Sequence, residues 1–274
     1  MSSNDPEIGN SVVAAGLKTN YIEAGSGEPV ILIHGSGPGV TAYANWRLVI
    51  PKLAEKFHVY APDIAGFGYT ERKAGVTYNL DFWVNHLMAF MDALGIKKAR
   101  FVGNSFGGGL TLAITTRFPE RVESFVLMGS AGTDFKLTPG LDAVWGYDPS
   151  VENMRKLVYS FAYNTGFITD DLVQSRYEAS VRPGFHETYS QMFQEPRQEK
   201  IRALATPDDK IRAIKQRALI LHGRDDNIVP LSASYHLHTL LEHADMHIFG
   251  ECGHWTQIER KDDFARLVID FFSK

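Results

Sequence analysis

The sequence predicts an α/β protein with a mostly parallel central sheet flanked by helices. Short apolar runs, each closed by a glycine- or proline-rich break, recur along the 274 residues. These runs are nearly continuous in aliphatic and β-branched residues, as in parallel strands that are covered on both faces. Stretches with helical spacing lie between the runs, which is typical of successive βαβ units. A chain of this length can bury a large core in one domain.

Six strands are expected in chain order. The first includes residues 30–33 and the second ends near Tyr60. The segments that contain the strands are "PVILIHGSG", "HVYAPDIAGFG", "ARFVGNS", "SFVLMGSAG", "RALILHGRDD" and "DMHIFGECG". Between the second and third strands, Asp81 is the expected N-cap of a helix that Gly95 ends. The apolar face of that helix has Val84, Leu87, Met88 and Met91, and the last helix has Phe264, Leu267, Val268 and Phe271 at the same spacing.

The alternation of strands and helices stops between residues 138 and 207. Helices are expected there after Pro149 and Ser150, after Thr169, and over about 188–193. Strands resume at Ala218. We therefore expect a helical cap, residues 138–207, inserted in a core formed by 1–137 and 208–274. A separate small domain is the alternative, but the return to strands favours an insertion.

Composition excludes several classes of partner. The net charge is −4 without any run of like charges, so neither nucleic acid nor a membrane is an expected partner. No apolar run is long enough to cross a bilayer.

A single cysteine, Cys252, allows no intrachain disulfide, and the N-terminus "MSSNDPEIGN" has no apolar signal, which favours the cytoplasm. Packing is the expected role of Cys252. His236, His238, His243 and His247 lack the spacing of metal ligands, so no metal site is predicted.

The stretch "VGNSFGGG" around Ser105 predicts a reactive serine. Residues 103–107 match G-x-S-x-G between a strand and a helix, which is the pattern of a nucleophile elbow. A glycine-rich turn with an incidental serine is the alternative. A serine needs a base, and the fold places an acid and then a histidine after later strands. Asp226 in "HGRDDNIVP" and His254 in "GECGHW" meet that order, with Asp225 as an alternative acid.

An oxyanion hole is also required, because negative charge develops on the attacked carbonyl oxygen. The backbone N–H of Phe106, directly after the serine, is one expected donor. Ser36 in the loop "HGSGPG" is the other. A phosphate-binding loop is the alternative for this segment, but no Lys-Ser or Lys-Thr pair follows it.

The sequence resembles the meta-cleavage product hydrolases, which are α/β-hydrolases that cut a carbon–carbon bond in ring-opened catechols. The resemblance covers nearly the whole chain and rests on "HGSGPGVTAYANWR", "GNSFGGG", "GLDAVWGYDPS", "SRYEASVRPGF" and "CGHWTQIE". It is strongest to the 2-hydroxymuconate semialdehyde hydrolases and their alkyl-substituted relatives. It implies an α/β-hydrolase fold, a homo-oligomer, no cofactor, and Ser105, Asp226 and His254 as the triad.

The resemblance also implies the substrate and its contacts. An anionic dienoate would lose its C5–C6 bond after ketonisation, through an acyl-enzyme on Ser105 or a gem-diol. Residues implied to hold the dienoate end are Asn45, Asn104, Arg176 and Trp255, and those implied to line the apolar side are Leu141, Trp145, Ile228 and Val229. From the residues alone, Arg176 is only a solvated helix residue. A carboxylesterase or lipase has the same triad, and a non-catalytic small-molecule receptor is the third possibility.

Overall fold

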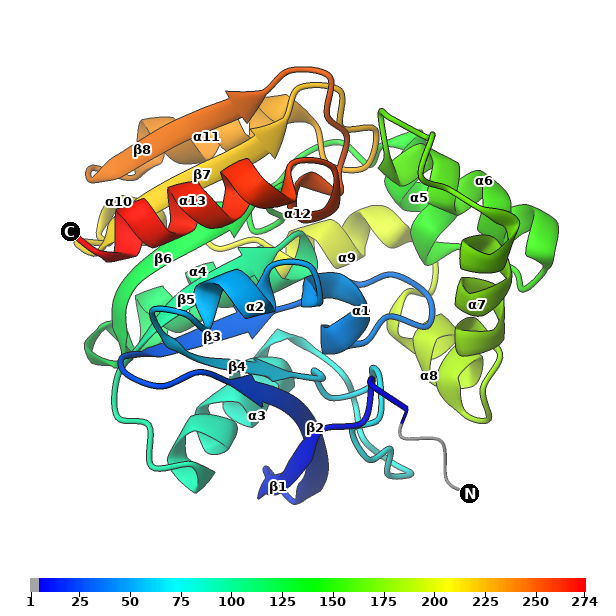
Figure 1. Cartoon of the computed structure of the whole chain (residues 1–274), viewed down its shortest axis with the longest axis horizontal. Helices are drawn as coiled ribbons and strands as arrows, with labels where there is room; N and C mark the ends of the chain where they lie inside the picture. Colours follow the sequence, from blue (N-terminus) through cyan, green and yellow to red (C-terminus); the bar gives the residue numbers. More distant parts are fainter. Residues whose placement is uncertain (1–4) are drawn as a thin grey trace.

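A single sheet of eight strands forms the centre of the molecule, as seen in the computed structural model, which describes residues 5–274 (Figure 1). The strand order is β1-β2-β4-β3-β5-β6-β7-β8. Strands β3 to β8 run parallel, whereas β1 and β2 are antiparallel to their neighbours. The strands are β1 (Asn10–Ala14), β2 (Leu17–Ala24), β3 (Pro29–Ile33), β4 (His58–Pro62), β5 (Ala99–Asn104), β6 (Val122–Met128), β7 (Arg217–Gly223) and β8 (Ala244–Phe249).

The six expected strands are therefore present as β3 to β8. The N-terminal hairpin β1–β2 was not predicted, because its strands mix apolar and polar residues and β1 is mostly exposed. A two-residue turn joins the two strands, and both of its residues, Ala15 and Gly16, have positive φ angles, 48° and 77°. This is the backbone twist that tight hairpins require.

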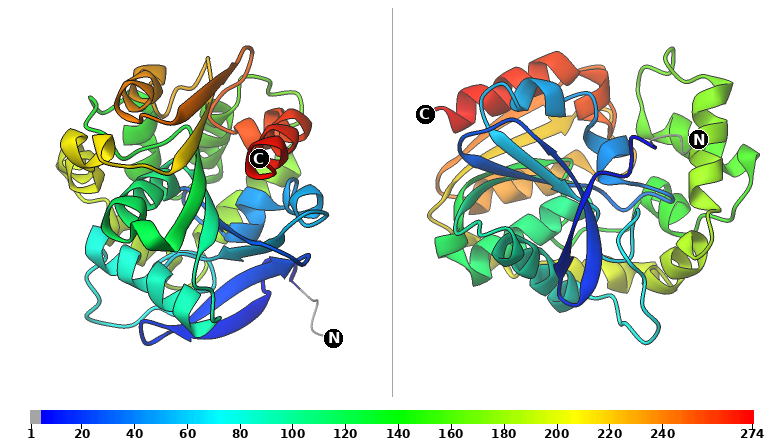
Figure 2. Two further views of the ribbon diagram at one scale, coloured as in Figure 1. Left: turned by 90° about the vertical axis from the view of Figure 1, so that its left-hand side faces the viewer. Right: turned by 60° about the horizontal axis from the view of Figure 1, so that its bottom comes forward.

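Helices cover both faces of the sheet, so the core has two halves (Figure 2). On one face lie α3 (Leu80–Ala93), α4 (Phe106–Arg117), α10 (Asp208–Arg212) and α11 (Leu231–Leu240). On the other lie α1 (Ala42–Trp46), α2 (Ile50–Leu53) and α13 (Lys261–Phe272), with α12 (Thr256–Glu259) before it. Asp81 was wrong as a cap of α3: the Asn79 side chain accepts the hydrogen bond of the Phe82 N–H, and Asp81 lies in the first turn.

Four helices from the segment without strands gather beyond the carboxyl ends of the parallel strands (Figure 1). They are α5 (Pro139–Trp145), α6 (Val151–Phe161), α7 (Asp170–Ser180) and α8 (Phe185–Met192). Ser150 and Thr169 cap α6 and α7 as expected, each accepting a backbone hydrogen bond. The next helix, α9 (Arg197–Leu204), packs against α4 of the core. Within residues 5–274, no helix has the length and apolar character needed to cross a membrane.

Candidate active site

Ser105 occupies a strained turn between β5 and α4. Its φ and ψ angles are 54° and −115°, a region that residues with a side chain rarely adopt. The turn is tight enough to exclude side chains nearby: a Cβ on Gly107 would lie 2.3 Å from the Ile33 carbonyl oxygen, and one on Gly103 would lie 2.5 Å from the Gly107 oxygen. The glycines of the motif therefore permit the close approach that a serine on a sharp turn at a strand end requires.

His254 and Asp226 meet at the ends of β8 and β7. The Nδ1 atom of His254 lies 2.7 Å from Oδ2 of Asp226. The other oxygen, Oδ1, accepts hydrogen bonds from the backbone N–H groups of Ile228 at 2.7 Å and Val229 at 3.0 Å. Asp225 points elsewhere and pairs with Arg224 at 3.2 Å. Of the two adjacent aspartates, the structure brings only Asp226 to the histidine.

The electrostatics of this pair keep Asp226 ionised. Burial alone would raise the pKa of its carboxyl, but the imidazoles of His254 and His222 outweigh burial and hold the pKa well below 3.8. An ionised Asp226 fixes the proton of His254 on Nδ1, which leaves Nε2 free to act as a base. No hydrogen bond joins Ser105 to His254 among residues 5–274, although both line one cavity. Such contacts are often loose before a substrate binds.

Ser36 and Phe106 present backbone N–H groups near Ser105. Phe106 is the first residue of α4, where N–H groups have no partner within the helix. The Ser36 side chain accepts a hydrogen bond from Nε1 of Trp145 at 2.9 Å, and its carbonyl accepts one from the Tyr189 hydroxyl at 3.0 Å. Neither N–H donates to another atom of the described chain. Both are therefore available to an oxyanion.

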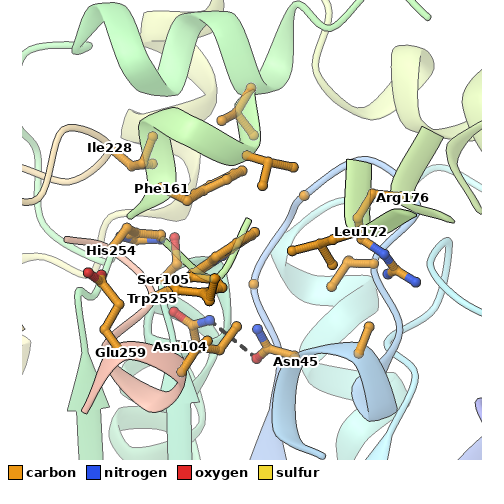
Figure 3. A pocket seen from close by; sticks show the side chains of 18 of the residues that line it. Asn45, Asn104, Ser105, Phe161, Leu172, Arg176, Ile228, His254, Trp255 and Glu259 are labelled. Carbon is orange, nitrogen blue, oxygen red and sulfur yellow. Dashed lines mark hydrogen bonds between the residues drawn. The ribbon is translucent and has the colours of Figure 1, made fainter. Parts of the chain in front are cut away.

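Two asparagines form the floor of the cavity beside Ser105 (Figure 3). The Nδ2 atom of Asn104 donates to Oδ1 of Asn45 at 3.2 Å, as the dashed line shows. Oδ1 of Asn104 is buried and has no partner within residues 5–274. An unpaired buried amide oxygen costs free energy, so a donor from a ligand would stabilise it. The hydroxyl of an enol is such a donor.

Arg176 enters the cavity from α7, on the side opposite His254 (Figure 3). Its Nη2 atom lies 2.9 Å from Oε1 of Glu7. The other oxygen of Glu7 lies 2.9 Å from Nη1 of Arg182. A second guanidinium, Arg47, also lines the cavity and forms no salt bridge with any described residue. This end of the cavity therefore carries positive charge suited to a carboxylate.

The sequence analysis missed both Glu7 and Arg47. Arg47 stands two residues after Asn45 in "ANWR", so its place beside a predicted contact was a usable signal. Glu7 lies far from every motif in the sequence, and only the folded chain brings it to α7.

Apolar side chains line much of the remainder of the cavity, whose volume is about 960 Å³. Leu141 and Ile228, predicted for the apolar side, and Trp255, predicted for the dienoate end, all lie on its wall. Trp145 and Val229 do not, which corrects the sequence analysis. Trp145 stacks on Phe193 and donates to Ser36, whereas Val229 lies behind the wall and donates its N–H to Asp226. Wall residues that were not predicted include Val144, Met154, Val158, Phe161 and Leu172.

Histidines outside this cavity make ordinary contacts. His236 on α11 lies 3.0 Å from Asp208, and His247 on β8 packs against Phe249. In the part of the chain that the structure describes, no group of three or more His, Cys, Asp or Glu side chains is arranged to hold a metal ion.

Comparisons with known proteins agree with this geometry. The family model described as "alpha/beta hydrolase fold" matches residues 28–261. A 2-hydroxymuconate semialdehyde hydrolase of Pseudomonas sp. strain CF600 is 53% identical over 271 residues, covering 99% of this chain and 96% of the relative. A 2-hydroxy-6-oxo-2,4-heptadienoate hydrolase of Pseudomonas putida strain F1 is 52% identical, covering 100% and 99%.

Among solved structures, a meta-cleavage product hydrolase from Pseudomonas fluorescens IP01, a mutant complexed with acetates, is 56% identical and superposes with a TM-score of 0.97. The match covers 98% of this chain and 99% of that one. Together with the sequence relatives, this shows that the chain belongs to the meta-cleavage product hydrolases, a family of carbon–carbon bond hydrolases with the α/β-hydrolase fold.

Proposed function

We propose that this protein hydrolyses the C5–C6 bond of 2-hydroxy-6-oxohexa-2,4-dienoate or a 6-alkyl analogue. The products are 2-hydroxypenta-2,4-dienoate and a carboxylic acid. One observation carries the proposal: a single cavity is lined at one side by Ser105 and His254 and at the other by Arg176 and Arg47. An elongated anion with its reacting carbonyl at one end and its carboxylate at the other matches this division.

The first stage is ketonisation of the dienol. The C2 hydroxyl loses its proton and C5 gains one, so C2 becomes a ketone that can later accept the electron pair of the breaking bond. His254, oriented by Asp226, is the group placed to move this proton. Arg176 holds the carboxylate, and the free oxygen of Asn104 accepts from the enol hydroxyl.

The second stage is addition to the C6 carbonyl. Either Ser105 attacks and forms an acyl-enzyme, or it assists a water molecule that forms a gem-diol. In both cases the N–H groups of Ser36 and Phe106 stabilise the C6 oxyanion. The C5–C6 bond then breaks, and its electron pair passes through the chain to the C2 oxygen. The gem-diol releases the acid product directly, whereas the acyl-enzyme releases it only after water hydrolyses the ester.

The remaining roles follow from the same cavity. Leu141 and Ile228, with the unpredicted wall residues, receive the C6 substituent. Trp255, whose ring stacks on Phe161 at 4.9 Å, supports the dienoate end. Residues 138–207 act as the cap that encloses the substrate. We assign the protein to the cytoplasm on its single cysteine, and we expect a homo-oligomer on the family resemblance.

A substrate panel tests the proposal. We expect kcat/KM for 6-hydrogen and 6-alkyl dienoates to exceed that for simple neutral esters, measured by loss of the dienoate absorbance and by ester hydrolysis. Ser105→Ala should lower kcat by about 10³-fold or more while dienoate binding remains. Arg176→Ala should harm dienoates and spare neutral esters. Faster turnover of simple esters would instead identify a carboxylesterase.

A further inference from the structure

A second histidine contacts the candidate catalytic acid. His222 is the penultimate residue of β7, and its side chain is fully buried. Its Nε2 atom lies 3.3 Å from Oδ2 of Asp226, the same oxygen that faces His254. His222 has no role in the reaction proposed above. We propose that His222 is a positioning residue for Asp226, held by Ser234 as a neutral imidazole that donates from Nε2; this rests on the proposed role of Asp226.

The neighbours of the ring determine where its proton lies. Nε2 faces the carbonyl oxygen of Val229 at 3.1 Å and the carboxylate of Asp226, and both of these groups can only accept hydrogen bonds. Nε2 therefore carries a hydrogen. Nδ1 lies 2.6 Å from Oγ of Ser234 on α11, and a hydroxyl can donate. Among residues 5–274 the buried Ser234 hydroxyl has no hydrogen-bond partner except Nδ1, so its proton points to Nδ1 and the imidazole is neutral.

These contacts close a ring around the acid. His222 donates to the Val229 carbonyl, while the Val229 N–H donates to Oδ1 of Asp226 at 3.0 Å. His222 on β7 thereby contacts the Asp226 loop twice: it lies against Oδ2 of the carboxylate, and it holds Val229, whose N–H donates to Oδ1. Without His222, Oδ2 would keep only its contact with His254, and the carboxylate could rotate away from the imidazole. Residues that orient a functional ligand in this way commonly affect activity by about 10- to 100-fold.

The experiment uses four variants of the full chain. His222→Leu removes the donor, whereas His222→Gln keeps an amide that can donate to Asp226. Ser234→Ala removes the group that fixes the ring. His86→Leu is the matched control, because His86 is also fully buried and hydrogen-bonded to a hydroxyl, Oγ1 of Thr19 at 2.8 Å, but makes no hydrogen bond or ion pair with Asp226.

Two rates are measured for each variant, together with its melting temperature. One is the rate of phosphonylation of Ser105 by a neutral organophosphonate, which needs the triad and no dienoate. The other is dienoate turnover, resolved into kcat and KM. For His222→Leu we expect both the phosphonylation rate and kcat to fall by about 10- to 100-fold with KM unchanged. His222→Gln should recover most of the rate, and Ser234→Ala should lose severalfold.

Several outcomes would contradict the proposed role of His222. The proposal fails if His222→Leu reacts with the phosphonate at nearly the wild-type rate, if the Gln and Leu variants lose the same rate, or if His86→Leu loses as much. If His222→Leu does not fold, an unchanged rate in Ser234→Ala overturns the proposal by itself. Absence of dienoate turnover in the wild type, with the phosphonylation ranking as expected, would reject the proposed function and leave the role of His222 standing.

Discussion

Arg176 and Glu7 form an ion pair of 2.9 Å that joins the helical segment to the N-terminal residues of the core. Glu7 is buried, and its second oxygen holds Arg182 of the segment after α7 at the same distance. The carbonyl of Glu7 accepts from Nδ2 of Asn20 on β2, which fixes Glu7 to the sheet. A guanidinium that faces the cavity is thus oriented from behind by a residue more than 160 positions away in the sequence.

Glu7→Gln should destabilise the fold. The substitution removes the carboxylate that pairs with Arg176 and the nearer of the two beside Arg182, which keeps Asp5 at 3.7 Å. Loss of a charge partner at this mostly buried site should cost about 1–3 kcal/mol of the free energy of unfolding. Urea denaturation followed by circular dichroism measures this loss. Glu152→Gln is the control, because Glu152 pairs with Lys156 at an exposed site, where the loss should be much smaller than for Glu7→Gln. Equal losses in the two variants would show that Glu7 has no special structural role.

The two adjacent aspartates should differ sharply. Asp226→Asn places an amide against Nδ1 of His254 and disturbs the tautomer that leaves Nε2 as a base, so kcat should fall by about 10⁴-fold. Asp225→Asn changes a partly exposed residue whose carboxylate pairs with Arg224 and not with His254, and kcat should remain near the wild-type value. Steady-state kinetics with the dienoate at pH 7 measure kcat of the two variants. The reverse ranking would assign the acid to Asp225.

The features that could be predicted from the sequence are those that depend on residues close together in the chain. Parallel strands that are buried on both faces consist of apolar runs, which are visible in the sequence. Around the turn after β5, positions 103 and 107 have room only for glycine, and these are the two glycines of the G-x-S-x-G motif. The hairpin β1–β2 was missed because an edge strand has no continuous apolar run. Asp81 was predicted as the cap of α3, but Asn79, two residues earlier, caps it; both residue types can cap a helix, and apolar spacing does not fix the start of a helix to within two residues.

Long-range placement explains the other differences. Trp145 and Val229 are apolar sequence neighbours of the wall residues Val144 and Ile228, and only the packed structure shows that they themselves do not line the cavity. Glu7 reaches Arg176 through the folding of the N-terminal segment, for which no sequence pattern exists. The order of Ser105, Asp226 and His254 was predictable because successive strand ends meet at one edge of the sheet.

Cys252 should be unreactive in the native protein. Burial, and next the charge of Glu259, raise the pKa of its thiol from 9.0 to about 12. Because a thiolate is the reactive form, the raised pKa keeps the thiol protonated at pH 8. At pH 8, a disulfide reagent such as DTNB should titrate no thiol in the folded protein and one per chain in urea. Rapid reaction of the folded protein at pH 8 would contradict this.

Arg47 should contribute to binding of the anionic substrate. Its Nη1 donates to the Ala44 carbonyl at 2.7 Å, which directs the side chain, and no described carboxylate forms a salt bridge with it. Burial and the like charge of Arg176 lower the pKa of this guanidinium, but an arginine still remains charged at neutral pH. Two like charges on one wall repel each other, and a bound carboxylate would relieve that repulsion.

We therefore expect Arg47→Gln to raise KM for dienoates by roughly three- to tenfold with little change in kcat. KM for a neutral ester should not change, and the increase of dienoate KM with ionic strength should become weaker, because one screened attraction is gone. Arg100→Gln is the control: Arg100 lies on β5 beside Glu28 and does not line the cavity, so both substrates should keep their constants. A loss shared equally by the dienoate and the neutral ester would show that Arg47 supports the loop around Asn45 and does not bind the anion.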